Sequence, residues 1–210
     1  MSTETLDDVV RELKACRICR DAPLYGAALP HEPRPVLQVS SSARLCLAGQ
    51  APGTRVHASG RPFTDPSGDR LRCWLGLDEA AFYDEARVAI LPMGHCFPGL
   101  DSKRSDLPPR RECAEIWRTR LLAQLPNIEL IVLIGRYAQD WHLGHAQKSM
   151  TEIMQNWRAI FEVPCTPRLL PLPHPSWRNS HWLKTNPWFE AEVLPTLRGE
   201  VQRLTHECCV

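Results

Sequence analysis

The chain has 210 residues, which is enough for one domain with its own hydrophobic core. Its 25 basic and 24 acidic residues give a formal net charge of +1, which excludes a protein that binds polyanions over its whole surface. No apolar stretch is long enough to cross a membrane and no signal peptide pattern opens the chain, so we expect a cytoplasmic protein. In that reducing setting the nine cysteines are expected to be metal ligands, buried residues or reactive thiols.

Segments with strand and helix patterns alternate along the chain. Residues 4–15 have helical spacing, and residues 20–43 are expected to wrap over the surface in an extended form. The run at 129–134 is apolar on both faces, as in a buried parallel strand. Strands are predicted at 44–48, 87–92, 129–134 and 168–172, and helices at 67–76, 110–125, 136–143, 150–161 and 186–205. This alternation predicts a single α/β domain over 1–210, a three-layer α/β/α sandwich with a central four-stranded parallel sheet.

Two loops rich in glycine and proline directly follow predicted strands. The first loop, residues 49–53, reads Gly-Gln-Ala-Pro-Gly, and the last loop, residues 174–179, reads His-Pro-Ser-Trp-Arg-Asn. Ligands of open α/β sheets bind at the carboxyl ends of the strands. We therefore expect both loops to contribute to one ligand site.

Four cysteines have a spacing that suits a metal centre. Cys16 and Cys19 form a Cys-x-x-Cys pair, Cys96 lies in a loop of glycine and proline, and Cys113 lies near a predicted helix start. Four thiolates can hold an iron–sulfur cluster or a structural zinc ion. Free cysteines are also often buried as small apolar residues. Spacing alone leaves both interpretations of Cys96 and Cys113 open.

The segment between the first loop and the next helix places an aromatic side chain beside a carboxylate. Phe63 could stack on a flat ligand, and Asp65 could hold a water molecule or oppose a developing positive charge. The structural alternatives are that Asp65 caps the following helix and that Phe63 belongs to the core.

The last loop offers another set of candidates. His174 precedes a proline, which favours an extended backbone at the strand end, and its imidazole could donate to an oxygen that gains negative charge. Trp177 and Arg178 could enter a base stack, although Trp177 could equally pack on a neighbouring helix. Lys103 and Arg104 belong to a local basic cluster that could follow a phosphate backbone or form a solvated face.

With these motifs in this order, the chain resembles the uracil-DNA glycosylase superfamily over about residues 14–195. Members share a four-stranded parallel sheet between helices, a first motif of Gly-x-x-Pro-Gly type and a second motif that begins His-Pro-Ser. The iron–sulfur branches, families 4 and 5, carry cysteines in the pattern of Cys16, Cys19, Cys96 and Cys113. The resemblance therefore implies a structural [4Fe-4S] cluster, with residues 1–43 as an N-terminal cluster-binding segment.

The resemblance also implies a reaction, the hydrolysis of an N-glycosidic bond in DNA after the damaged nucleotide has been flipped out of the stack. The backbone amides of Gly49 and Gln50, with His174, would stabilise the departing base. Phe63 would stack on that base, and Asp65 would orient the attacking water and stabilise the sugar cation. Contacts with DNA would come from Ser176, Trp177, Arg178, Lys103 and Arg104. The expected partner is single- or double-stranded DNA with a damaged base, and we expect a monomer.

Two positions depart from these families. Gln50 stands where family 4 has Glu, so catalysis would depend on Asp65. Pro92 stands where iron–sulfur members have an Asn that reads uracil, and proline offers no side-chain donor and no N–H. The base would then be read by backbone groups near Met93 and Gly94 or by His95, with hypoxanthine or xanthine as candidate substrates beside uracil.

Two other functions compete with this one. A non-catalytic protein could use the same pocket to bind damaged or single-stranded DNA, and the departures at the first motif and at Pro92 agree with it. An iron–sulfur redox protein would need the cysteines but would leave both loops unexplained.

Overall fold

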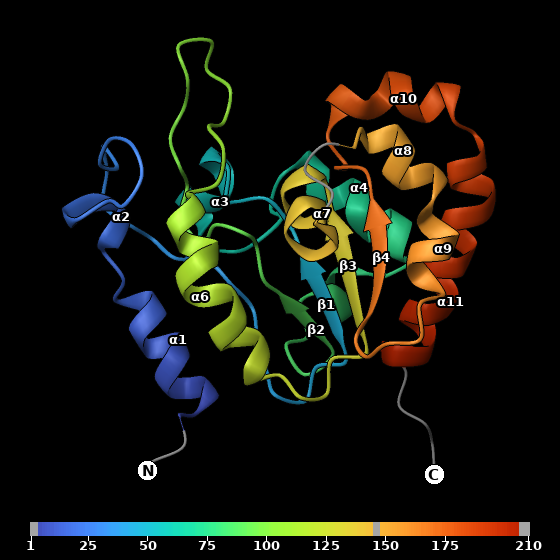
Figure 1. Ribbon diagram of the computed structural model, residues 1–210, viewed down its shortest axis with the longest axis horizontal. Coiled ribbons are helices and arrows are strands. Elements are labelled where there is room, and N and C mark those ends of the chain that lie inside the picture. Colours follow the sequence, from blue (N-terminus) through green and yellow to red (C-terminus); the bar gives the residue numbers. More distant parts are fainter. Residues whose placement is uncertain (1–3, 145–147, 206–210) are drawn as a thin grey trace.

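A parallel four-stranded sheet forms the centre of the computed structural model, which describes residues 4–144 and 148–205. The strands are β1 (Leu45–Ala48), β2 (Val88–Ile90), β3 (Leu130–Ile134) and β4 (Arg168–Leu172), in the order β2-β1-β3-β4. Leu45 pairs with Val88 on one side and with Leu130 on the other, and all three strand pairs are parallel. Their carboxyl ends therefore meet at one edge, which is uppermost in Figure 1.

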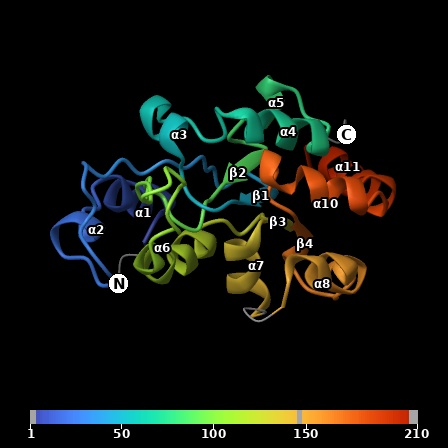
Figure 2. The ribbon, with the colours of Figure 1, turned by 90° about the horizontal axis from the view of Figure 1, so that it is seen from above.

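The two faces of the sheet carry different cores. In β1, Leu45 and Leu47 belong to the larger core, whereas Cys46 and Ala48 belong to the other. This alternation follows from the strand geometry, in which successive side chains point to opposite faces. Figure 2 shows α4, α5 and α11 on one side of the sheet and α1, α6 and α7 on the other. The predicted three-layer α/β/α sandwich is therefore confirmed.

The helices agree with the predicted ones except where they are short or interrupted. The predicted helix at 150–161 is two helices, because the backbone turns at Asn156 and its side chain donates to the Glu152 carbonyl oxygen at 2.8 Å. Among the described helices, none is long and apolar enough to span a membrane. The helices are α1 (Leu6–Lys14), α2 (Ile18–Asp21), α3 (Thr54–Ser59), α4 (Pro66–Leu75), α5 (Glu79–Phe82), α6 (Arg111–Ala123), α7 (Arg136–Leu143), α8 (Met150–Gln155), α9 (Trp157–Phe161), α10 (Ser180–Thr185) and α11 (Leu194–Thr205), with a 3-10 turn at Trp177–Asn179 and a π-helical turn at Phe189–Val193.

A buried cation ties two of these helices to the sheet. Arg118 of α6 is 2% exposed and donates to the carbonyl oxygen of Leu91 at 2.6 Å. Its guanidinium also lies 2.9 Å from Nε2 of His142 on α7. Burial, and to a smaller extent the Arg118 charge, lowers the pKa of His142 to about 3. The neutral imidazole can therefore accept a hydrogen bond from Arg118 and hold α6 against α7.

A long connection between β2 and α6 stands away from the body of the molecule. Its residues 97–109, called the hairpin loop below, rise on the side of the strand carboxyl ends (Figure 1). Leu100 and Asp106 form an antiparallel bridge, and the Asp101 carboxylate accepts from the N–H groups of Lys103 and Ser105, both at 2.8 Å. The hairpin loop is therefore held by its own hydrogen bonds, with its tip in solvent.

Candidate active site

The first and last loops line one cavity of about 510 Å³ at the carboxyl edge of the sheet. We call it the reacting cavity. The strand ends of β1 and β4 deliver these loops, as expected for ligand sites in parallel sheets. Its lining includes Val36, Gly49, Gln50, Phe63, Asp65, Arg70, Ile90, Pro92, Asp106, His174, Ser176, Trp177, Arg178 and Asn179.

The first loop presents free backbone donors to this cavity. Its carbonyl oxygens are occupied, because the N–H groups of Met93 and Gly94 donate to Gly49 and Gln50 at 2.9 Å each. By contrast, no hydrogen bond within residues 4–144 and 148–205 uses the N–H groups of Gly49 and Gln50. A Cβ at Gly49 would lie 3.2 Å from Cζ of Phe63, so glycine permits the close approach of the ring. Unpaired donors of this kind suit an atom that becomes negatively charged.

Phe63 sits on a loop whose backbone is held in an unusual conformation. Its φ is 55°, in the left-handed region that non-glycine residues rarely adopt. A Cβ at Gly68 would lie only 1.9 Å from the Phe63 carbonyl oxygen, so the start of α4 tolerates no other residue there. Phe63 also packs edge to face on Phe82, with ring centroids 6.1 Å apart. The ring therefore belongs to the core and lines the cavity at once.

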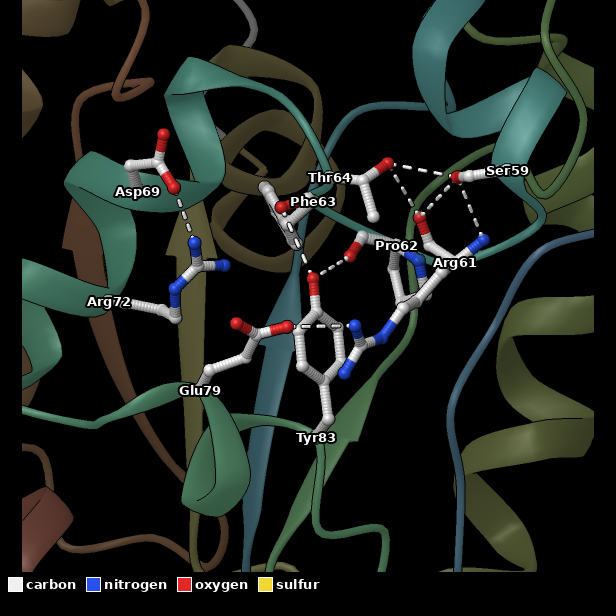
Figure 3. Close-up of polar contacts among 9 residues, drawn as sticks. All are labelled: Ser59, Arg61, Pro62, Phe63, Thr64, Asp69, Arg72, Glu79 and Tyr83. Carbon is white, nitrogen blue, oxygen red and sulfur yellow. Dashed lines mark hydrogen bonds and ion pairs between the residues drawn. The ribbon is translucent and has the colours of Figure 1, made fainter.

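Tyr83 fixes this loop from below, as Figure 3 shows. Its hydroxyl donates to the carbonyl oxygen of Pro62 at 2.8 Å and lies 3.3 Å from that of Phe63. The guanidinium of Arg61 lies 3.4 Å from the centroid of the Tyr83 ring and pairs with Glu79 at 2.8 Å. These contacts fix the position of the aromatic ring in the cavity.

Asp65 combines the two interpretations that the sequence left open. It is the N-cap of α4, and its Oδ1 accepts from the N–H of Gly68 at 3.3 Å. It also lines the reacting cavity. Its second carboxylate oxygen has no hydrogen-bond partner in the part of the chain that the structure describes. One oxygen can therefore orient the side chain while the other faces a ligand or water.

His174 lies at the cavity end of β4. A Cβ at Gly135, whose φ is 79°, would lie 3.2 Å from Cβ of His174, so the glycine makes room for this side chain. The amide of Asn179 donates to the His174 carbonyl oxygen at 2.7 Å. Burial lowers the pKa of His174, while Asp65 raises it and Arg178 lowers it further. The imidazole is thus neutral near pH 7 and can donate one hydrogen bond.

The remainder of the last loop forms the outer rim of the cavity. Trp177 is 77% exposed, whereas Trp182 and Trp188 pack on each other with centroids 5.8 Å apart. Arg178 donates to the Ser105 hydroxyl at 3.0 Å, which connects the last loop to the hairpin loop. The carbonyl oxygen of Ser176 accepts from Arg70 at 3.1 Å. Trp177 therefore points its ring into solvent rather than into the core.

Five of the residues predicted to contact the base or DNA lie outside the cavity lining. Lys103 and Arg104 are exposed at the tip of the hairpin loop, and Arg104 has a φ of 60°. Met93 is 3% and His95 is 2% exposed, and the backbone N–H of His95 donates to Sγ of Cys113 at 3.3 Å. The N–H groups of Met93 and Gly94 are those already bound to the first loop. Pro92 does line the cavity, where it forms an apolar wall with Val36 and Ile90.

Asp106 is a carboxylate of the cavity that sequence reasoning missed. It lies at the end of the hairpin loop, in the stretch Ser-Asp-Leu-Pro-Pro. A Cβ at Gly53 would lie 3.2 Å from its Oδ2, so its carboxylate rests against the first loop. No residue pattern signals this contact, because it depends on how a long loop folds back over the sheet edge.

The four predicted cysteine ligands line a second, smaller cavity, called the cysteine pocket below. Burial raises the pKa of Cys19 to about 11 and that of Cys96 to about 12, so without a metal these thiols are protonated. No three His, Cys, Asp or Glu side chains among the described residues are arranged to hold a single metal ion. A set of four cysteines is the donor set of a [4Fe-4S] cluster, which occupies more space than one ion. Four cysteines are also the donor set of a structural zinc ion, so the lining of the pocket suits either group.

Comparison with known proteins agrees with this geometry. The family model described as the uracil DNA glycosylase superfamily matches residues 37–198. The chain is 28% identical over 161 residues to a type-4 uracil-DNA glycosylase of Archaeoglobus fulgidus, which covers 76% of this chain and 74% of the relative. The family match spans both loops, the hairpin loop and two of the four cysteines that line the cysteine pocket, Cys96 and Cys113. From its sequence and its fold, the chain belongs to the uracil-DNA glycosylase superfamily.

Proposed function

We propose that this protein is a DNA glycosylase that hydrolyses the N-glycosidic bond of a flipped-out deaminated base. One observation carries the proposal: free backbone donors and a neutral histidine share a cavity with a partly free carboxylate. Cleavage of this bond leaves negative charge on the base and positive charge on the sugar. The cavity offers groups of the appropriate kind for each.

The departing base would be stabilised by hydrogen-bond donors. The N–H groups of Gly49 and Gln50 are unpaired within the described chain, so a base oxygen can accept from them without breaking an existing bond. His174 adds a hydrogen-bond donor that is uncharged before the reaction. Preorganised donors of this type lower a transition-state energy by several kcal/mol, about 3 for a single donor. Phe63 would hold the plane of the base.

The sugar would be stabilised by Asp65. A carboxylate close to the oxocarbenium-like carbon lowers its energy and can orient the attacking water. The cap to Gly68 fixes the orientation of the side chain and leaves one oxygen for this task. This role makes up for the absence of an acid at Gln50.

The base that is removed would be uracil or a related deaminated base such as hypoxanthine or xanthine. The wall of Val36, Ile90 and Pro92 offers no side-chain donor or acceptor to a base edge. Such a wall selects a base by its shape. A side-chain amide would reject a wrong base more strictly, because its own polar groups would be left unpaired. We therefore expect a broader range of bases than a uracil-reading amide allows.

DNA would lie across the rim of the cavity. The exposed ring of Trp177 can fill the space that a flipped nucleotide leaves, and Arg178 can contact a phosphate beside Ser176. Lys103 and Arg104 extend this basic rim to the tip of the hairpin loop. With a net charge of only +1, this local patch is the expected contact.

The cysteine pocket would hold a [4Fe-4S] cluster through Cys16, Cys19, Cys96 and Cys113. When bound, the cluster would cross-link the N-terminal segment to the loop after β2 and to the start of α6. This is a structural contribution, and the excision reaction needs no electron transfer. Residues 1–43 would then act as the cluster-binding segment of a single domain.

A cleavage panel tests the proposal. Protein purified without oxygen is incubated with labelled oligonucleotides that carry one uracil, hypoxanthine, xanthine or thymine mismatch, in single- and double-stranded form. We expect abasic sites at one or more deaminated bases with the wild type, and none with Asp65→Ala. Tight binding of the oligonucleotides with no cleavage at any of the bases would instead favour a non-catalytic protein that recognises damaged DNA.

A further inference from the structure

We propose that Asp106 is a second catalytic carboxylate of the reacting cavity, which accepts a proton from the attacking water while Asp65 stabilises the sugar. The inference rests on the proposed glycosylase function and assigns a further residue to it. It comes from the position of one side chain at the end of the hairpin loop.

The carboxylate of Asp106, and not only its stem, faces the first loop. Oδ2 lies 3.2 Å from the place that a Cβ would take at Gly53, and Cγ and Oδ1 lie 3.9 Å from it. Asp106 and Asp65 line the same cavity. Among the described residues, the Asp106 carboxylate has no hydrogen bond or ion pair that would give it a structural role. It is therefore available to a water or a substrate.

The hairpin loop places this side chain through backbone contacts. Asp106 forms the bridge with Leu100, and the N–H of Leu107 donates to the Gly99 carbonyl oxygen at 3.0 Å. The neighbouring Ser105 accepts from Arg178, which connects the hairpin loop to the last loop. Asp106 is thus fixed on both sides although its own side chain is unpaired.

The electrostatic surroundings of Asp106 suit a proton acceptor. Partial desolvation raises the pKa of its carboxyl group, Arg178 lowers it, and the Asp65 carboxylate raises it again. These two are the charged groups that face it, one from the last loop and one from the N-terminus of α4. A carboxylate with a raised pKa is a stronger base than an exposed one.

The step is a hydrolysis. The water oxygen forms a bond to C1′ of the sugar, and its proton passes to the Asp106 carboxylate. The bond between C1′ and the base nitrogen breaks, and its electron pair leaves with the base. Donors at Gly49, Gln50 and His174 bind that negative charge. The carboxylic acid then returns its proton to solvent or to the released base, so no oxidant or metal is consumed.

The test is single-turnover excision with enzyme in excess, measured across pH on the base that the wild type removes. General base catalysis contributes about 100-fold or more, so we expect Asp106→Asn to slow excision by about that factor. The wild-type rate should rise with pH as the acid form of Asp106 loses its proton, and this limb should vanish in Asp106→Asn. Asp106→Glu should recover part of the rate.

DNA affinity separates catalysis from charge and folding effects. Removing a negative charge at the rim should leave binding of a non-cleavable duplex unchanged or slightly tighter, because DNA is a polyanion. Asp101→Asn removes the same charge from the same loop outside the cavity, and its pH profile should keep the wild-type shape. The inference is wrong if Asp106→Asn keeps the wild-type rate and profile, or if it only weakens binding as a disrupted hairpin loop would. A wild type that excises no base contradicts the proposed function itself.

Discussion

The reacting cavity and the cysteine pocket share one short segment but use it in opposite ways. Pro92 lines the reacting cavity, and Cys96, four residues later, lines the cysteine pocket. Between them, Met93 and Gly94 donate to the carbonyl oxygens of the first loop. The reacting cavity leaves donors and carboxylates unpaired, whereas the cysteine pocket is much smaller and is lined by the four thiols. The segment that lines the cysteine pocket can therefore hold the first loop in place without contacting substrate.

The largest expected effect is at the cysteine pocket. Cys96→Ser removes a proposed cluster ligand, and a lost structural ligand that binds about 1,000-fold above its Kd costs about 4 kcal/mol of unfolding free energy. We expect the melting temperature to fall by about 10 °C and the iron and sulfide content to drop. Cys73→Ser, at an exposed cysteine outside the pocket, is the control. Equal iron content and equal stability in both variants would show that the cysteine pocket does not hold a cluster.

Substitutions in the reacting cavity should slow the reaction and leave the stability of the fold nearly unchanged. His174→Ala removes a donor to the departing base, so we expect excision to slow by about 100- to 1,000-fold. Stability and binding of a non-cleavable duplex should change little, because no described hydrogen bond uses the His174 ring. His181→Ala, on the exposed side of α10, is the matched control. An excision rate within twofold of the wild type would remove His174 from the reaction.

Trp177 tests the rim of the cavity. Its ring is 77% exposed, so Trp177→Ala should not destabilise the fold. Stacking of one aromatic ring on a base contributes about 1–3 kcal/mol, which predicts about a tenfold loss of excision from duplex DNA. Single-stranded substrate has no stack to refill and should be affected less. Trp141→Ala, at another exposed tryptophan (41%) outside the cavity, is the control, and equal losses on both substrates would contradict a wedge.

Tyr83 tests the support of the Phe63 loop. Tyr83→Phe removes the hydroxyl that donates to the Pro62 carbonyl oxygen, which costs about 1 kcal/mol. A looser Phe63 would raise KM by about fivefold and leave the single-turnover rate at saturation nearly unchanged. Tyr137→Phe, at an exposed tyrosine, should change neither. A fall in the saturated rate alone would indicate that Tyr83 acts elsewhere.

An effect of pH on stability is expected outside both cavities. His142 has a pKa of about 3 in the folded chain and about 6.5 when unfolded, so below pH 6.5 the unfolded chain binds a proton that the folded chain does not. Acidification therefore lowers the unfolding free energy, by up to about 1.4 kcal/mol per pH unit. His142→Gln keeps an acceptor for Arg118 and should flatten this slope between pH 6.5 and 4.5 in denaturant titrations. An unchanged slope would show that other groups cause it.

Much of the fold could be predicted because the strands have a strong pattern. The run at 129–134 is apolar throughout, and the Gly/Pro loops after β1 and β4 mark the strand ends. The break at Asn156 could not be predicted, since the apolar spacing continues through it. The short helix α10 has only two apolar residues, Trp182 and Leu183, and both stay partly exposed.

The site was easiest to predict where the strands of the sheet lead directly into it. Gly49, Gln50 and His174 follow strands directly, so their meeting follows from the topology. Asp106 lies on a long loop that folds back over the sheet edge, and its contact with Gly53 leaves no pattern in the sequence. The sequence also could not predict that the N–H groups of Met93 and Gly94 are already hydrogen-bonded, because their acceptors lie far away in the chain, in the first loop.

The most direct test of the account is to measure the free base released in a single turnover. Anaerobically purified wild type, in excess over a duplex with one uracil or hypoxanthine, should release base and leave one abasic site for each base. His174→Ala should bind the same duplex and release base at least about 100-fold more slowly. Stable binding of every duplex by the wild type, with no base released from any, would contradict the account and identify a protein that only recognises the lesion.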